Sequence, residues 1–102
     1  MSGRHDRRDS FVDMRHDLPG RDLIDQGLTD LAAGAETAAS LLVSIGAPRL
    51  RQLGVAVPDT FPSSEHRLYA LLSRSDPDSA HARYNALLRR LVSFERALAC
   101  GR

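Results

Sequence analysis

The most regular hydrophobic pattern in the chain covers residues 21–45. Its apolar side chains recur at alternating spacings of four and three residues, at Ile24, Leu28, Leu31, Ala35, Ala38, Leu42 and Ile45. This is the a/d repeat of helices that pack against another helix, sustained over about three heptads. It predicts one continuous helix over 21–45 that ends at Gly46. The residues that we expect to form an interaction seam are Leu28, Leu31, Ala35, Ala38 and Leu42.

Two glycines lie within this pattern. Gly27 and Gly34 are seven residues apart, so a helix places them on the same side. Two interpretations are open. Either they let a second helix cross closely at that side, or they are simply tolerated, at a cost of up to about 1 kcal/mol each relative to Ala.

A second long helix is predicted over 77–99. Asp76 suits the cap position, Pro77 the first helical position, and Asp78 complements the positive end of the helix dipole. At about 100° per residue, the larger apolar side chains fall in one wide arc, which predicts a buried face. The arc contains Ala80, Tyr84, Leu87, Leu88, Leu91, Val92, Phe94 and Leu98. A separate strip of small side chains, where another helix would approach closely, contains Ala82, Ala86, Ser93 and Ala97.

Shorter elements fill the middle of the chain. Pro48 and Gly54 bracket a short helix predicted over 48–53, and a third main helix is predicted over 64–74. Residues 55–57 are strand-like, but no second strand signal exists to pair with them. The fold class is therefore all-α: a small bundle of three main helices (21–45, 64–74, 77–99) and one short helix (48–53).

The first part of the chain differs in composition. Residues 1–19 are mostly charged, with too few apolar side chains to offset the entropy of ordering them, so we expect a disordered tail. Met14 begins a second plausible translation start, which makes residues 1–13 candidates for an untranslated segment. The remainder, 20–102, is expected to form a single helical domain.

Composition narrows the class of protein further. The 102 residues carry a formal net charge of +1, which argues against a domain whose main task is non-specific phosphate binding. Aromatic residues make up 5% and Trp is absent, so the core must be built from Leu and Ala, which suits helices. Every basic residue is Arg, which we interpret as the codon bias of a GC-rich, bacterial genome.

The expected location is the cytoplasm. Cys100 is the only cysteine, which excludes an intramolecular disulfide and suits a reducing compartment. No apolar run approaches the ~20 residues of a membrane span, and the first residues lack the apolar segment of a signal peptide. We therefore expect no membrane partner.

Motifs that carry chemistry are scarce. The sequence contains no phosphate loop, dinucleotide fingerprint, CxxC pair, HExxH or GxSxG motif. His5 and His16 each stand beside an Asp, but metal sites need three or four ligands on a rigid frame, so neither a metal nor a cofactor is expected. Glu95 falls inside the predicted buried arc, where burial would raise its pKa and require a partner. The candidate partners are Arg67, Arg74 and the hydroxyl of Tyr69.

One pair of residues suggests a catalytic alternative. Arg74 and His81 are separated by six residues across the start of the last predicted helix. In an all-α chain, this spacing resembles the Arg-x4–6-His signature of HEPN ribonucleases, although Ser75 fits the polar neighbour of that motif poorly and Pro77 departs from it. The resemblance implies that Arg74 stabilises phosphate charge and His81 acts as general base, in a site formed by two protomers on RNA. Otherwise they are a turn Arg and a helix-end His without a joint role.

A second alternative is nucleic-acid binding. The last predicted helix carries a possible basic stripe formed by Arg83, Arg89, Arg90 and Arg96. The same residues are also compatible with a solvated or acid-paired face. No DNA-binding module is recognisable, because the helix that follows the 74–77 turn is too long for a recognition helix and begins with core residues.

The function expected from the sequence is a non-enzymatic protein-interaction module, either a homodimer or a subunit of a complex. Two long helices offer more apolar or small-residue faces than a chain of this length buries alone. Nucleic-acid binding and a HEPN-like ribonuclease are the alternatives.

Overall fold

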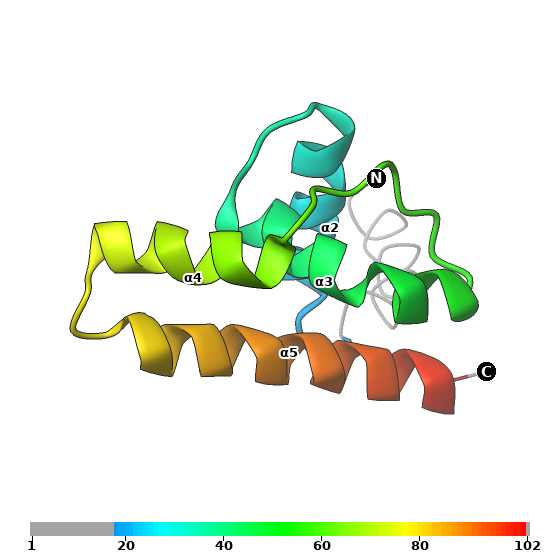
Figure 1. Ribbon diagram of the computed structural model, residues 1–102. Coiled ribbons are helices and arrows are strands. Elements are labelled where there is room, and N and C mark those ends of the chain that lie inside the picture. Colours follow the sequence, from blue (N-terminus) through cyan, green and yellow to red (C-terminus); the bar gives the residue numbers. More distant parts are fainter. Residues whose placement is uncertain (1–17, 102) are drawn as a thin grey trace, which may run out of the picture.

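Residues 18–101 form four helices in the computed structural model (Figure 1), which describes this part of the chain. The helices are α2 (Arg21–Ala32), α3 (Ala38–Gln52), α4 (Ser64–Ser75) and α5 (Ala80–Cys100). Residues 18–101 contain no strand, so the all-α class is confirmed. Residues 1–17, which include the possible start at Met14 and most of the predicted tail, lie outside the described residues.

None of the four helices combines the length and the apolar composition that crossing a lipid bilayer requires.

The central element is α3. It packs against α2, α4 and α5, and its side chains Leu41, Leu42, Val43 and Leu50 are fully or almost fully buried. Figure 1 shows α4 and α5 running antiparallel on either side of the turn that joins them, with the end of α3 lying over the C-terminal half of α5. One side of α5 is thus covered by α4 and α3 in succession.

The predicted helix over 21–45 is two helices. Gly34 adopts a left-handed conformation (φ 75°) that favours glycine, and its N–H donates to the carbonyl oxygen of Leu31. The N–H of Ala35 donates to the carbonyl oxygen of Asp30 at 2.8 Å. This pair of bonds is the Schellman arrangement, which ends α2 by satisfying its last carbonyls. The a/d repeat continues across the break, but the backbone does not.

A network of side-chain hydrogen bonds starts α3. The hydroxyl of Thr37 accepts from the N–H of Ser40, and the hydroxyl of Ser40 accepts from the N–H of Thr37, which together form a capping box. The Thr37 hydroxyl also donates to the carboxylate of Asp30 at 2.7 Å, and the Ser40 hydroxyl donates to the carbonyl oxygen of Ala35 at 2.8 Å. These bonds hold the end of α2 against the start of α3.

The predicted short helix over 48–53 is the last part of α3. Gly46 does not end a helix; it is buried inside α3, where an added Cβ would meet the side chain of Leu91 in α5 at 2.8 Å. Pro48 lies on the exposed side of the same helix and costs it one backbone hydrogen bond. Burial of Ala47 and Leu50 on either side of Pro48 offsets that cost. Gly54 (φ 94°) ends α3, as predicted.

The other two main helices are close to their predicted positions. The helix predicted over 64–74 is α4, which ends one residue later. The helix predicted over 77–99 is α5, but it begins at Ala80, because residues 77–79 form a turn in which the N–H of Ser79 donates to the carbonyl oxygen of Asp76.

Candidate functional site

The interaction seam predicted from the heptad repeat packs within the chain itself. Leu31 is 5% exposed and Leu42 is fully buried, while Leu28 and Ala38 pack against the same core. Ala35 is half-buried in the connection between α2 and α3. These side chains are therefore engaged by their own chain.

One side of α5 is turned away from α3 and α4. Six residues line a shallow hollow there, which we call the outer face of α5: Asn85, Leu88, Arg89, Val92, Ser93 and Arg96. Val92 is 42% exposed, so its assignment to the buried arc was wrong. Its neighbour Leu91 is 4% exposed and belongs to the core. Val92 lies at the edge of the predicted arc. The pattern of one helix does not show how far the neighbouring helices extend around it, so burial at this edge is not predictable from that pattern.

The outer face of α5 has heptad spacing of its own. Asn85, Leu88 and Val92 follow one another at three and four residues, and Leu88 is partly buried against the core. Arg89 follows Leu88, and Arg96 follows Glu95, the polar residue at the next position of the repeat. These are the e positions of a heptad, which flank the apolar seam of paired helices. This spacing is present in the sequence, but Leu88 and Val92 also belong to the wide apolar arc that predicts a buried face.

Neither arginine of this face has an ionic partner in the part of the chain that the structure describes. Within residues 18–101, ion pairs join Arg21 to Asp25 and Arg67 to Glu36, and none involves Arg89 or Arg96. Both arginines are exposed. The result is an exposed apolar side chain flanked by two uncompensated positive charges.

The four arginines of the predicted stripe do not lie on one side of α5. Arg83 and Arg90 are seven residues apart and share one side, and Arg89 and Arg96 share another. At about 100° per residue, the two pairs are separated by roughly 100° around the helix axis. All four are exposed, but only the second pair borders the hollow.

Glu95 points toward α3 instead of the outer face. One of its carboxylate oxygens lies close to Gly46, 3.1 Å from the position that a Cβ atom on this glycine would occupy. Burial raises the pKa of Glu95, and the positive charge of Arg49 opposes this by lowering it. The relevant basic residue is therefore Arg49 of α3, rather than the three partners considered from the sequence.

An aromatic cluster lies between α4 and the start of α5. The ring of Tyr69 meets Tyr84 edge to face at 5.4 Å between centroids and lies 6.4 Å from the ring of His81. Tyr69 is 39% exposed. Burial, and then the negative charge of Glu65, raise the pKa of Tyr84.

The ribonuclease pair is not assembled by any direct bond. Arg74 lies in the last turn of α4 and His81 near the start of α5, and both are exposed. The imidazole of His81 is hydrogen-bonded to the amide of Asn85 at 3.2 Å, and among residues 18–101 no hydrogen bond or ion pair reaches the side chain of Arg74. Each residue is thus placed by its own helix.

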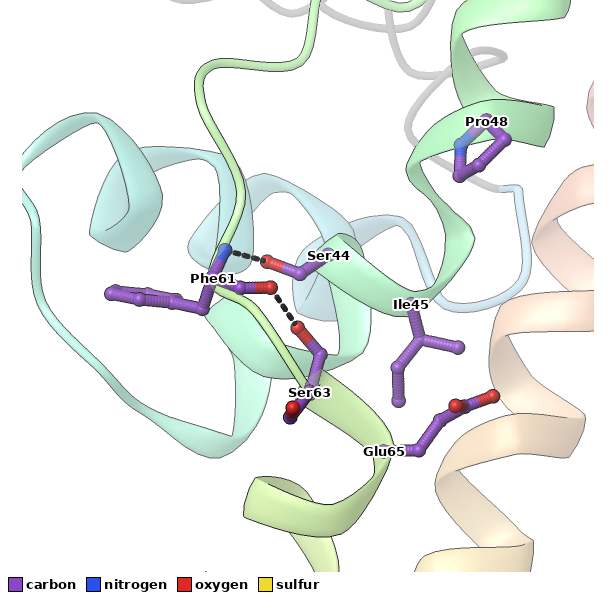
Figure 2. A pocket seen from close by; sticks show the side chains of 7 residues that line it. Ser44, Ile45, Pro48, Phe61, Ser63 and Glu65 are labelled. Carbon is purple, nitrogen blue, oxygen red and sulfur yellow. Dashed lines mark hydrogen bonds between the residues drawn. The ribbon is translucent and has the colours of Figure 1, made fainter.

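A second hollow, between α3 and the start of α4, is lined by hydroxyl groups (Figure 2). The hydroxyl of Ser44 accepts from the N–H of Phe61 at 3.3 Å and donates to the carbonyl oxygen of Ser40 at 2.9 Å. The hydroxyl of Ser64 donates to the carbonyl oxygen of Phe61 at 2.6 Å. These hydroxyls anchor the loop before α4 and are already engaged, so we assign the hollow a role in the fold.

No group of His, Cys, Asp and Glu that would hold a metal ion occurs within residues 18–101, and Cys100 is an exposed free thiol. Comparison with protein-family models, with characterised proteins and with solved structures found no match.

Proposed function

We propose that this chain is a non-enzymatic protein-interaction module whose contact surface is the outer face of α5. The observation that carries the proposal is Val92, a large apolar side chain that is 42% exposed between Arg89 and Arg96. Neither arginine forms an ion pair with any other of residues 18–101. Exposed apolar groups with a charged rim are typical of protein-binding surfaces.

The arrangement of α5 supports this choice. Its opposite side is fixed in the core by Leu91 and Phe94, so the outer face is presented on a rigid element. From Asn85 to Arg96 this face extends about 17 Å at about 1.5 Å per residue, which corresponds to three turns of a partner helix. Heptad spacing with flanking charges is the pattern by which helices select one another.

The partner is a protein, either a second copy of this chain or a different one. We propose that binding takes place in the cytoplasm, because Cys100, the only cysteine, lies exposed and free at the end of α5, as a reducing compartment allows.

Photo-crosslinking from single positions tests the proposal in cells that express the chain. A photoreactive amino acid at position 92 is expected to give a discrete protein adduct. The matched control is position 29, because Thr29 is exposed on α2 and does not line the outer face of α5. Equal adducts from both positions, no adduct from position 92, or adducts to nucleic acid alone would contradict the proposal.

A further inference from the structure

We infer that the partner presents an acidic amphipathic helix, with an apolar stripe bordered by carboxylates seven residues apart. This inference rests on the proposed function, since it specifies what the outer face of α5 binds. It follows from three features of that face: its apolar centre, its charge, and the spacing of its charges.

The charge of α5 is unbalanced. It carries four arginines and one carboxylate, that of Glu95. Glu95 is directed toward α3 near Gly46, so it leaves the outer face with positive charge only. A partner with carboxylates at this face is attracted to it, whereas one with lysines there is repelled by like charges.

The spacing of the two arginines defines where those carboxylates lie. Arg89 and Arg96 are seven residues apart, or about 10.5 Å along the helix axis. A partner helix that packs on Leu88 and Val92 places its own flanking residues at the same period, because paired helices share the heptad repeat. Asp or Glu at two positions seven apart on one border of a Leu-rich stripe therefore matches this face.

A second copy of the chain fits less well. In an antiparallel pairing of two outer faces, e positions face e positions, so Arg89 and Arg96 meet the same arginines of the partner. In a parallel pairing they face g positions, which are Tyr84, Leu91 and Leu98 and offer no carboxylate. Neither orientation neutralises the two arginines.

The acidic helix α2 of a second copy does not supply the missing charge either. Asp25 is ion-paired with Arg21 at 2.9 Å, and Asp30 accepts hydrogen bonds from Gln26 and Thr37. These two carboxylates are already engaged by their own chain, which leaves Asp22 as the one exposed carboxylate of α2, a single charge where the outer face of α5 presents two arginines. A different protein is therefore the occupant that the charges favour.

Nucleic acid is a weaker match as well. Phosphate recognition needs several basic side chains along one side, but Arg83 and Arg90 point away from Arg89 and Arg96 around α5. The centre of the face is Val92, an aliphatic side chain that offers neither hydrogen bonds nor an aromatic surface for base stacking.

Two designed peptides of about 21 residues test the inference directly. Both have Leu on one stripe; one has Glu and the other Lys at the flanking positions. Fluorescence anisotropy with the full chain is expected to show at least about tenfold tighter binding of the Glu peptide, equivalent to about 1.4 kcal/mol. The charge-reversed variant R89E/R96E is expected to prefer the Lys peptide, and circular dichroism verifies that it stays folded.

The variant R83E/R90E is the matched control. It changes the net charge of α5 by the same amount on the other side of the helix, so it is expected to retain the preference for the Glu peptide. Equal binding of both peptides, no binding of the Glu peptide at about 1 mM, or equal effects of the two double variants would overturn the inference.

Two further outcomes would also overturn it. One is a chain dimer, seen by light scattering, that Val92→Ser dissociates; the other is a duplex oligonucleotide that displaces the Glu peptide. Crosslinking from position 92 remains an independent readout of the proposed function. If position 92 gives a protein adduct but the chain binds both peptides equally, the outer face of α5 remains the proposed interaction surface. Only the inference of an acidic partner helix is then rejected.

Discussion

Gly27 of α2 faces the carbonyl oxygen of Ala39 in α3 with no room for a side chain between them. A Cβ placed on Gly27 would overlap with that oxygen and with a methyl group of Val43. The absent side chain lets α2 cross α3 at close range, and Gly27 itself is buried at the crossing. Of the two interpretations open for Gly27, close crossing of a second helix is therefore the one that the structure supports.

Gly27→Ala is expected to lower the free energy of unfolding by about 2–3 kcal/mol, because a backbone oxygen cannot move aside without separating the two helices. Gly46→Ala is the matched control in another helix. The added Cβ there meets the ends of the Leu91 side chain, at 2.8 and 2.9 Å, which are able to rotate. Urea denaturation followed by circular dichroism compares the two variants. A larger loss from Gly46→Ala would contradict this account of the crossing.

The hydroxyl of Thr37 joins the capping box of α3 to the carboxylate of Asp30 in α2. Thr37→Ala removes both bonds and is expected to cost about 1–2 kcal/mol in the free energy of unfolding. Thr29→Ala serves as the control, since Thr29 is exposed on α2 and its expected effect is within about 0.5 kcal/mol. Similar values for the two variants would show that the cap contributes little.

Sequence and structure agree best where local signals suffice. The start of α4 at Ser64 and the end of α3 at Gly54 both follow from residues that commonly begin or end helices. Gly34 and Gly46 show the limit of such signals. Gly34 ends α2 in a left-handed conformation, whereas Gly46 continues α3 because Leu91 of α5 packs against it. The contact that distinguishes them comes from a helix 45 residues further along the chain, which no local pattern contains.

The candidate site was missed for a related reason. Leu91 and Val92 are adjacent apolar residues about 100° apart on α5, and the predicted arc includes both. Burial depends on how far α3 and α4 extend around α5, which is a property of the packed helices. The charges were recognisable individually, but only the packing separates the pair at Arg89 and Arg96 from the rest.

Adjacent truncations test this division of α5 into a core side and an outer face. Leu91→Ala is expected to lower the free energy of unfolding by about 2–4 kcal/mol, since Leu91 is 4% exposed. Val92→Ala is expected to change it by less than about 0.5 kcal/mol while weakening partner binding. Thermal unfolding and the crosslinking assay measure the two effects separately. A loss above about 1 kcal/mol for Val92→Ala would show that Val92 contributes to the core and would contradict its assignment to the outer face.

Arg74 and His81 give a prediction that separates an interaction module from a ribonuclease. Arg74→Ala and His81→Ala are expected to leave the crosslinked adduct from position 92 unchanged, because neither residue lines the outer face of α5. Incubation of the full chain with labelled RNA is expected to show no cleavage that depends on His81. Cleavage by the natural chain that is lost in a folded His81→Ala variant would establish the catalytic alternative instead.

The carboxyl group of Glu95 makes stability dependent on pH. Burial raises its pKa above the ordinary value of 4.5, so the folded chain holds the proton more tightly than the unfolded chain does. The resulting stabilisation is complete below that ordinary value and is lost as the pH rises through the raised one. Above that window, a charged and partly buried carboxylate opposes folding.

Glu95→Gln is therefore expected to increase the free energy of unfolding at neutral pH and to have no such effect below the ordinary pKa of the carboxyl group. Arg49→Gln is expected to raise the pKa of Glu95 further, because it removes the positive charge that lowers that pKa. Carbon-detected NMR of the Glu95 carboxyl follows its titration, and urea denaturation at the two pH values measures stability. A gain from Glu95→Gln that is equal at both would show that the ionisation of Glu95 is not its cause.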